Sequence, residues 1–271
     1  MNKKISVIMA VHNCAKTVDK AIQSIMDQTY TNWVMIICDD GSTDNTLAVV
    51  KGYEEKYPDK FKVIQNEGNK KLPYSLNHCL KYVETELVAR MDGDDWSMPE
   101  RFEKQVAFLE SHPDVVLVGT GVAVSDGENQ IGSIIKTPTP TKETMLTQNA
   151  FSHASIMTYK YVYDSLGGYS LDPTVLRVED VDLWCRFLAA GYVGHNITDE
   201  LYVILEDANA VRRRSFSARL NEAKTRNRGY RLMGFKGWVT VKPYLGILKA
   251  FVPVKVYQIL HERRFKKNKL S

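Results

Sequence analysis

The sequence has only four cysteines in 271 residues, and no two of them form a Cys-x-x-Cys pair. Each lies within or beside an apolar stretch, which predicts buried thiols in a reducing compartment. The chain also lacks the ~18 consecutive apolar residues that a membrane-spanning helix needs, and its N-terminal apolar stretch is too short for a signal peptide. We therefore expect a cytoplasmic protein without a transmembrane anchor.

Strong charge of either sign is also missing, because the formal net charge is only +4. The positive charge is uneven: residues 249–271 contain seven Lys or Arg and one Glu, a net charge of +6, which leaves −2 for the rest. This distribution excludes a generally basic nucleic-acid binder and indicates a basic tail on a near-neutral domain. The hydrophobic content of 44% is enough to bury a core in one large or two small domains.

The first hundred residues alternate between short β-rich apolar runs and segments with helical spacing of apolar residues. This alternation predicts a parallel sheet covered on both faces by helices. The predicted strands are 5–11, 33–38, 61–66 and 86–91, and the predicted helices are 15–28, 43–53 and 73–83.

From Val115 the pattern changes, and 115–136 predicts an antiparallel hairpin around the turn Asp126–Asn129. Further along, we expect short helices at 142–149 and 160–166, a helix at 179–191 that stops at Gly191, and a last strand at 200–206. Two basic stretches follow, at 212–231 and 249–269.

Polar residues directly follow three of the predicted strands, where an open α/β sheet binds its ligands. Asp39 and Asp40 end the second strand, and one reading is a turn followed by a helix cap. A cap needs only one carboxylate, whereas two could accept hydrogen bonds from a ligand N–H or from ribose hydroxyls.

Asp92, Asp94 and Asp95 follow the fourth strand and repel one another unless something neutralises them. Asp92 and Asp94 lie two apart around a glycine, so both could point into one cleft and hold Mg²⁺ or Mn²⁺ together with substrate phosphates. The residues of a calcium-binding loop are missing, and a plain acidic turn is the alternative.

The segments SVIMAVHN, DDGSTDNT, ARMDGDD, GGYS and VEDVDLWCRF, in this order, resemble family 2 glycosyltransferases of the GT-A fold over residues 4–207. KLPYSLNHCL and RFEKQVAFLE are most similar to bacterial exopolysaccharide-biosynthesis members. The resemblance implies an α/β fold of GT-A type: a Rossmann-like, mostly parallel central sheet flanked by helices, with appended antiparallel strands and a C-terminal helical extension. It also implies a catalytic domain at 1–207, with a nucleotide-binding half at 1–98 and an acceptor half at 99–207, and a basic extension at 208–271.

For the donor side, the resemblance implies that Asp39 or Asp40 contacts the base of a UDP-sugar, with Lys71 near the uracil and phosphates. Asp92 would meet the ribose or sugar, and Asp94 would ligate the divalent metal, while Asp95 would brace the loop. The metal, Mn²⁺ or Mg²⁺, would neutralise charge on the leaving UDP. The implied donor residues in this half are Val11, Asn13, Asp39, Asp40, Lys71, Asp92 and Asp94.

For the acceptor side, the resemblance implies that Asp180, or else Glu179, is the base that takes the proton of the acceptor hydroxyl, and that the sugar carbon inverts. The alternative is that both acids simply favour the positive end of a helix. Asp182 should turn elsewhere, and Trp184 should belong to the core. His153 corresponds to a position beside the acceptor or donor sugar, or else is structural.

The chain departs from the family pattern after the last strand, where Arg212, Arg213 and Arg214 stand instead of a single basic or His residue. Arg213 and Arg214 are candidates to clamp the diphosphate, although three consecutive arginines cannot all face one ligand. The tail 249–271 is either a solvated helix end or an anchor at the membrane interface.

Together these features predict a metal-dependent, inverting hexosyl- or N-acetylhexosaminyltransferase on the cytoplasmic face of the membrane. It would move a sugar from a UDP-sugar to a saccharide or lipid-linked saccharide during surface polysaccharide synthesis. Sugar-phosphate nucleotidyltransferases and dinucleotide oxidoreductases would need glycine-rich loops that the sequence lacks after its first strand. The alternative is a protein of the same fold that acts mainly by binding a protein partner.

Overall fold

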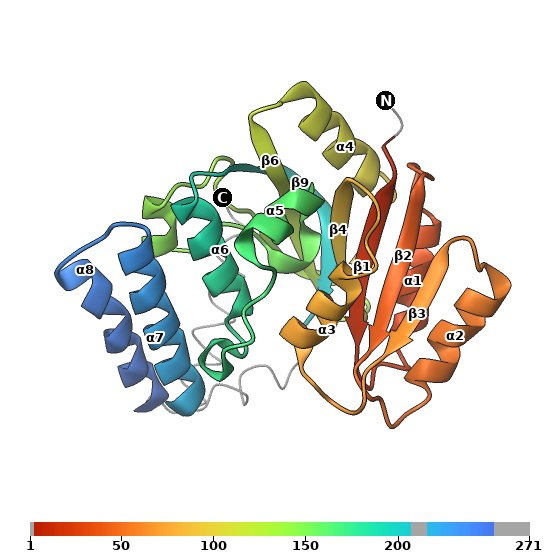
Figure 1. Cartoon of the computed structure of the whole chain (residues 1–271), viewed down its shortest axis with the longest axis horizontal. Helices are drawn as coiled ribbons and strands as arrows, with labels where there is room; N and C mark the ends of the chain where they lie inside the picture. Colours follow the sequence, from red (N-terminus) through yellow and green to blue (C-terminus); the bar gives the residue numbers. More distant parts are fainter. Residues whose placement is uncertain (1–2, 207–215, 252–271) are drawn as a thin grey trace.

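A computed structural model describes residues 3–206 and 216–251, and within them the chain builds one nine-stranded sheet (Figure 1). The strand order is β3-β2-β1-β4-β8-β6-β9-β5, and β7 pairs with β6. The strands are β1 (Ile5–Val11), β2 (Trp33–Asp39), β3 (Phe61–Gln65), β4 (Leu87–Asp92), β5 (Trp96–Ser97), β6 (Val115–Ser125), β7 (Gln130–Ile134), β8 (Met157–Tyr159) and β9 (Val193–Leu205).

Helices cover both faces of this sheet, as the alternating pattern predicts. Side chains of α1, α2 and α4 pack on one face in a core that includes Val7 of β1. Side chains of α3, α5 and α6 pack on the other face, around Ile8 of the same strand. Successive residues of β1 therefore enter two different cores, which explains why the strand reads as a continuous apolar run. The helices in this part are α1 (Val18–Met26), α2 (Thr46–Lys56), α3 (Leu72–Leu80), α4 (Arg101–Ser111), α5 (Lys160–Leu166) and α6 (Glu179–Ala189).

The four strands of the first half are parallel, and the second half adds antiparallel strands, as expected. β8 lies antiparallel between β4 and β6, and β6 forms the predicted hairpin with β7. β9 runs parallel to β6, so the direction of the first four strands is continued beyond β8. Short 3-10 helices complete this half: η1 (Glu143–Leu146), η2 (His153–Ser155) and η3 (Pro173–Val175).

Several element boundaries differ from the sequence prediction, and two of the differences have a clear cause. α2 begins at Thr46 rather than Thr43, because the Asp44 carboxylate accepts hydrogen bonds from both the N–H and the hydroxyl of Thr46 and keeps the preceding residues in a turn. β9 begins at Val193 rather than Glu200, since its early residues pair with β6. The sequence pattern also did not predict α4, because the buried face of this helix includes Arg101 as well as apolar residues.

The described part of the C-terminal extension is helical, as predicted, and stands beside α6 (Figure 1). It consists of α7 (Phe216–Leu232), α8 (Trp238–Val241) and η4 (Lys242–Phe251). The Tyr230 hydroxyl donates to the carbonyl of Met145 at 2.7 Å, so α7 also contacts η1. The domain division at 207/208 stays a prediction. In the part of the chain that the structure describes, no helix combines the length and apolarity needed to cross a membrane.

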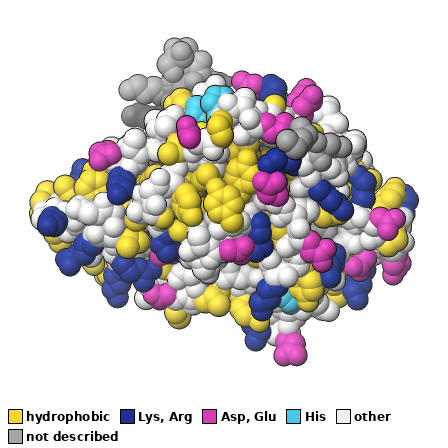
Figure 2. Space-filling view, turned by 45° about the horizontal axis from the view of Figure 1, so that its top comes forward, with side chains coloured by type: hydrophobic (Ala, Val, Ile, Leu, Met, Phe, Trp, Pro, Cys, Tyr) yellow, Lys and Arg dark blue, Asp and Glu magenta, His cyan; other side chains and the backbone are white. Residues whose placement is uncertain are grey.

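The described cysteines are free thiols, and Cys38, Cys79 and Cys185 are buried as predicted. The prediction is wrong for Cys14, which is only partly buried. On the face shown in Figure 2, basic and acidic side chains are interspersed around a central group of hydrophobic side chains. The charge on this face is therefore mixed.

Candidate functional site

The carboxyl ends of β1, β2 and β4 lie side by side in the sheet. Val11 pairs with Asp39 across β1 and β2, and Ala10 pairs with Asp92 across β1 and β4. The register therefore brings two of the acidic groups predicted from separate motifs to one edge of the sheet. This edge is the position at which open α/β sheets bind their ligands.

The two carboxylates that follow β2 have different surroundings. Asp40 is buried and accepts hydrogen bonds from the N–H groups of Lys70 and Lys71, both at 2.8 Å, and from Asn66 Nδ2 at 2.8 Å. Asp39 is fully buried, and its Oδ2 accepts the N–H of Ser42 at 3.1 Å. Asp39 Oδ1 is buried with no hydrogen-bond partner among the described residues. An orphaned buried acceptor is costly unless a ligand donates to it, so Asp39 suits a ligand N–H better than Asp40 does.

Asp40 instead holds the loop before α3 against the end of β2. Lys71 has a φ of 77°, a conformation rarely adopted by non-glycine residues, and the hydrogen bond from its N–H to Asp40 stabilises it. Gly41 has a φ of 71°, and a Cβ there would lie 2.5 Å from Gly68 Cα. The two loops thus meet through backbone atoms, while the exposed Lys71 side chain stays available to a ligand.

Hydrogen bonds from Val11 and Asn13 hold the loop that follows β2. The Val11 carbonyl accepts the N–H of Asp40 at 2.8 Å. Asn13 Oδ1 accepts the N–H of Thr43 at 2.8 Å, and the N–H of Asn13 donates to Ser42 Oγ at 3.0 Å. The structure therefore places both residues at the predicted edge, with these polar groups already engaged in shaping it.

Asp92, Asp94 and Asp95 each offer one carboxylate oxygen, and these oxygens all lie within 4.8 Å of one another. Burial and the charges of the other two carboxylates raise the pKa of Asp95 to about 8. Asp95 Oδ1 accepts the N–H of Leu205 at 3.0 Å, so this residue braces the turn against β9, as expected. A hard divalent cation would offset the repulsion within this cluster, so the donor set fits Mg²⁺ or Mn²⁺.

The turn that carries these acids is packed closely against β1. A Cβ at Gly93 would lie 2.9 Å from Val11 Cγ1 and 3.0 Å from Cys14 Sγ, so glycine lets the turn approach the strand. Thr17 Oγ1 donates to the Gly93 carbonyl at 2.9 Å. The backbone of the Asp-Gly-Asp segment is therefore held against the end of β1 and the loop that follows it.

Arg90 is a buried cation that the motif analysis missed. Its Nη2 lies 2.6 Å from Asp92 Oδ1, and its carbonyl accepts a 2.8 Å hydrogen bond from the buried Arg101. Its charge lowers the pKa of His153 and opposes the rise in the pKa of Glu179 and Asp180. Arg90 thus links the acidic cluster electrostatically to the base candidates. The signal in the sequence was an arginine within an otherwise apolar strand.

Glu179 and Asp180 begin α6, as predicted. Glu179 is buried, its Oε2 has no hydrogen-bond partner among the described residues, and burial raises its pKa. Asp180 Oδ2 accepts from Asn149 Nδ2 at 3.0 Å, and its Oδ1 accepts the N–H of Val181 at 2.8 Å. Burial raises the pKa of Asp180, while the charges of Arg226 and Arg90 oppose the rise. In both groups burial shifts the pKa upward, which is the direction expected of a general base.

Asn149 and Arg226 extend this site into the C-terminal extension and were also missed. Arg226 Nη2 of α7 donates to Asn149 Oδ1 at 2.9 Å, and Asn149 in turn donates to Asp180. Arg226 Nε pairs with Glu222 at 3.1 Å. These hydrogen bonds connect Arg226, Asn149 and Asp180, which are far apart in sequence, so no local motif predicts them.

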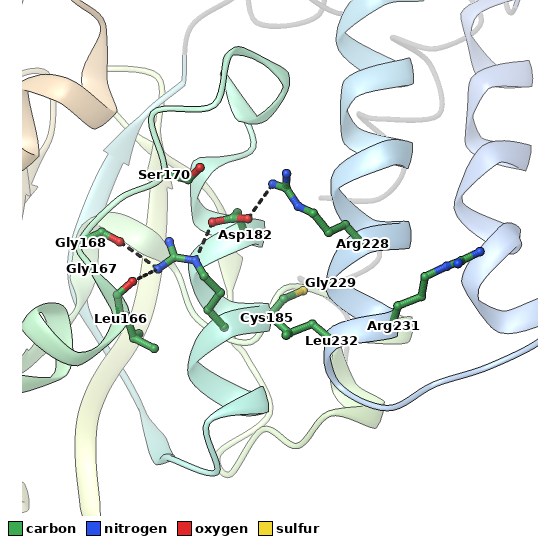
Figure 3. A pocket seen from close by; sticks show the side chains of 11 residues that line it. Leu166, Gly167, Gly168, Ser170, Asp182, Cys185, Arg228, Gly229, Arg231 and Leu232 are labelled. Atoms are coloured by element: carbon green, nitrogen blue, oxygen red, sulfur yellow. Dashed lines mark hydrogen bonds and ion pairs between the residues drawn. The ribbon is translucent and has the colours of Figure 1, made fainter.

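Asp182 faces away from Asp180, as expected, and joins α6 to α7. Its carboxylate bonds Arg186 Nε at 2.8 Å and Arg228 Nη2 at 2.9 Å, and Figure 3 shows Asp182 and Arg228 pointing toward one another. These residues line a pocket of about 670 Å³ between the two helices. A Cβ at Gly229 would lie only 2.3 Å from Cys185 Sγ, so the helices are in close contact here.

His153 is engaged with an aromatic cluster that includes Trp184 of α6. Its Nε2 lies 2.9 Å from the Tyr169 hydroxyl, and burial together with the charge of Arg90 holds its pKa well below the ordinary value. Trp184 is fully buried and packs edge-on against His153, which confirms the prediction that Trp184 belongs to the core. Arg212, Arg213, Arg214 and the tail from 252 lie outside the described residues.

Comparisons with known proteins agree on one family and one fold. A family model described as Glycosyl transferase family 2 matches residues 6–163. The chain is 40% identical over 261 residues to EpsE of Bacillus subtilis (strain 168), whose name describes a glycosyltransferase; the match covers 96% of this chain and 94% of EpsE. It is 30% identical over 268 residues to the amylovoran biosynthesis glycosyltransferase AmsE of Erwinia amylovora, covering 95% of this chain and 98% of AmsE.

A further relative and a solved structure add detail. The chain is 25% identical over 202 residues to WfaP of Escherichia coli, named a UDP-Glc:alpha-D-GlcNAc-diphosphoundecaprenol beta-1,3-glucosyltransferase, covering 71% of this chain and 73% of WfaP. TarS of S. aureus (residues 1–349), solved in complex with UDP-GlcNAc, superposes with a TM-score of 0.69 at 18% identity, covering 92% of this chain and 73% of TarS. The structural likeness shows the fold, which is of GT-A type.

Proposed function

Because the chain belongs to glycosyl transferase family 2 and is a glycosyltransferase of GT-A fold, we propose that it moves a sugar from a UDP-sugar to a saccharide acceptor in surface polysaccharide synthesis. AmsE, which is named for amylovoran biosynthesis, supports this role, and TarS with its UDP-GlcNAc supports the donor class. No observation on the described residues favours a partner-binding module, so we do not propose one.

The observation that carries the proposal is the unsatisfied carboxylate oxygen of Asp39 at the edge where two acidic segments meet. Asp39 Oδ1 is buried and needs a donor, and a nucleobase N–H is a donor of the right kind. Asp40 supports it by fixing the loop that presents Lys71. In this proposal Val11 and Asn13 contribute by shaping the loop on the other side of Asp39.

We assign the divalent metal to Asp94, with Asp92 toward the ribose or sugar. When bound, the metal neutralises charge that develops on the diphosphate of the leaving nucleotide. Asp92 is oriented by Arg90, and Asp95 fixes the turn to β9. The residues Arg213 and Arg214 stay candidates to bind the same diphosphate.

Asp180 is the proposed base, and Glu179 is the second candidate. The base takes the proton of the acceptor hydroxyl as the acceptor oxygen bonds to the sugar carbon and the bond to UDP breaks, with the electron pair leaving on UDP. One displacement of this kind inverts the configuration at the carbon. Asn149 holds one oxygen of Asp180, which leaves Glu179 Oε2 as the orphaned acceptor in the pair. His153, neutral at pH 7, contributes a hydrogen-bonding group on the acceptor side.

The acceptor in this proposal is a saccharide linked to a lipid diphosphate, as the name of WfaP describes for that enzyme. Such an acceptor places the protein at the cytoplasmic face of the membrane. Contact through the basic segment 249–271 would follow from its charge of +6.

Thermal unfolding of the full chain with UDP, GDP and ADP, each with and without Mn²⁺, tests the proposal. A ligand at ~100 times its dissociation constant stabilises by about 2.7 kcal/mol. We expect stabilisation by UDP that requires Mn²⁺ and disappears in Asp39→Asn, which loses the carboxylate charge but keeps the shape. Equal stabilisation by all three nucleotides, or none by UDP, would contradict the proposed donor.

A further inference from the structure

One side of the helical segment that follows α7 carries exposed apolar side chains. Trp238 and Val241 of α8 are 66% and 44% exposed, and Leu245 of η4 is 50% exposed. Lys242 lies between them in the sequence and is exposed as well. Side chains three or four residues apart share one side of a helix, so these four lie together. We refer to Trp238, Val241, Lys242 and Leu245 as the outer face.

The opposite side of the same segment is attached to the protein. Asn227 Nδ2 of α7 donates to the Thr240 carbonyl at 2.6 Å, and Thr240 is buried. Val239 packs against the core that contains Trp184. The outer face is therefore presented by a segment whose other side is held in place by packing and hydrogen bonding.

The charge around the outer face is basic. Residues 223–251 contain seven Lys or Arg and no Asp or Glu. Arg231 at the end of α7 and Lys236 in the turn before α8 are exposed, as is Lys242. At the left end of Figure 2, which α7 and α8 form in Figure 1, hydrophobic and basic side chains lie together. This combination is complementary to an anionic partner that also accepts apolar groups.

The exposed apolar side chains are concentrated in this part of the molecule. Single exposed hydrophobic residues are normal on a protein surface, but a group of them marks an interaction site. Four of the thirteen exposed large hydrophobic side chains of the described residues lie within 232–245, with Leu232 as the fourth beside those of the outer face. Tryptophan favours the interface between membrane and water, and lysine is attracted to anionic headgroups.

From this arrangement we propose that the outer face docks on an anionic lipid bilayer. Trp238, Val241 and Leu245 enter the headgroup region, and Lys236 and Lys242 contact anionic headgroups. The inference goes beyond the proposed function, because it requires neither the donor nor the acceptor. It also differs from a contact made by the charge of 249–271, because it adds apolar insertion by α8 and η4.

Docking through the outer face would orient the molecule. In Figure 1, α6, α7 and α8 lie side by side with α8 outermost, and α2 lies at the other end of the molecule. The side that carries α6 would therefore lie nearer the bilayer than the side that carries α2.

Sedimentation of the full chain with vesicles tests the proposal. We expect binding to vesicles of equal parts phosphatidylglycerol and phosphatidylcholine, and much weaker binding to phosphatidylcholine alone. Trp238→Gln should lower the partition coefficient by at least about tenfold, because a large apolar contact with the bilayer is lost. Lys242→Gln should lower it about fivefold at low salt, because one charge near the surface is lost. Both side chains are exposed, so the variants should fold.

Exposed residues elsewhere provide the matched controls. Leu171 is 57% exposed, and Lys51 is exposed on α2. Leu171→Gln and Lys51→Gln should leave the partition coefficient unchanged. Equal losses in Trp238→Gln and Leu171→Gln, or no loss in Trp238→Gln, would overturn the proposal. If the full chain does not bind the anionic vesicles, the proposal is also overturned, and an acidic protein becomes the better partner for this face.

Tryptophan fluorescence locates the contact independently of affinity. Trp33 and Trp184 are buried and Trp96 is partly buried, whereas Trp238 is largely exposed. Brominated lipids in the same vesicles should quench the full chain, and the quenching should disappear in Trp238→Phe, which keeps an apolar ring for binding. Trp96→Phe is the control and should retain the quenching. Quenching that persists in Trp238→Phe would show that another part of the protein enters the bilayer and would overturn the assignment.

The outcome is separable from that of the proposed function. Stabilisation by UDP and Mn²⁺ is measured on the same samples, and its absence in the unmodified chain would contradict the donor proposal alone. In the variants it also reports that the protein is folded. Normal stabilisation together with unaltered vesicle binding in Trp238→Gln would reject the outer face alone.

Discussion

The two ends of the candidate site are held together in different ways. At the end near β2, the buried carboxylate of Asp40 is held mainly by backbone N–H groups of the loop before α3. At the start of α6, Asp180 is held on one oxygen by a side chain, Asn149, which is itself held by Arg226 of α7. The first end is shaped by the main chain, and the second by long side chains from separate elements.

This difference affects how each end can vary. A network of backbone hydrogen bonds tolerates many side chains as long as the turns keep their shape, so the nucleotide end depends on few positions such as Gly41 and Asp40. At the proposed acceptor end, a change at Arg226 of α7 would reach Asp180 through Asn149. We infer that the extension, although it follows the last strand, takes part in selecting the acceptor.

The sharpest test of the comparison is Asp180→Asn, which should reduce sugar transfer by about 10²–10⁴-fold because a general base contributes that much. UDP binding with Mn²⁺ should be unchanged, since Asp180 belongs to the other end. Transfer assayed with a radiolabelled UDP-sugar and UDP affinity measured on the same sample give the two values.

Glu179→Gln is the control for this experiment. If Glu179→Gln abolishes transfer and Asp180→Asn does not, the base is Glu179. Normal turnover in both variants would remove the start of α6 from the reaction.

Asp94→Asn should lower the affinity for UDP, whereas Asp180→Asn should leave it unchanged. Loss of one charged partner costs roughly 1.5–3 kcal/mol, so the Mn²⁺-dependent affinity for UDP should fall about 10- to 100-fold. The much weaker affinity for UDP that remains without metal should stay the same. Titration of Mn²⁺ at fixed UDP measures the effect, and an unaltered Mn²⁺ requirement would move the ligand to Asp92.

The sequence predicts where the residues of the proposed nucleotide end lie, because the determinants of their positions are local. A buried strand followed at once by acids and glycine specifies both the edge of the sheet and the side chains there, as Asp39 and Asp92 show. Parallel pairing then brings these ends together without further information. The acidic cluster and the brace at Asp95 follow from the same logic.

The acceptor end could be predicted only in part. Glu179 and Asp180 were found because they open a helix in a recognisable motif, but Asn149 and Arg226 lie 31 and 46 residues from Asp180. Their contact depends on how α7 packs against α6, which periodicity does not encode. Arg90 was missed because an arginine in an apolar strand looked like an exception to the pattern rather than a buried cation beside the acids.

The joint between α6 and α7 provides a third test. Gly229→Ala would place a methyl group 2.3 Å from Cys185 Sγ and push the helices apart, so we expect a loss of about 1–3 kcal/mol in unfolding free energy. Gly52→Ala is the matched control, because nothing lies within 4 Å of a Cβ there and the exposed helix should gain up to about 1 kcal/mol.

Denaturant unfolding gives these stabilities, and the transfer assay links them to the site. At a temperature where Gly229→Ala stays folded, transfer should fall while UDP affinity holds. A fall in UDP affinity as large as the fall in transfer would mean that α7 supports both ends equally.

The smallest effect should be a change in pH dependence in Arg226→Gln. A base acts as its carboxylate, so kcat/KM falls as the pH drops through the pKa of Asp180. Arg226 opposes the rise in this pKa that burial causes, so removing its charge should raise the pKa further and move the acid limb of the profile to higher pH. Lys224→Gln, which removes an exposed charge from the same helix, should leave the limb in place. If Arg226→Gln lowers kcat/KM equally at every pH, Arg226 only positions Asn149. If it moves the acid limb, α7 also sets the proton affinity of the base. The two ends of the site then differ in electrostatics as well as in the hydrogen bonds that hold them.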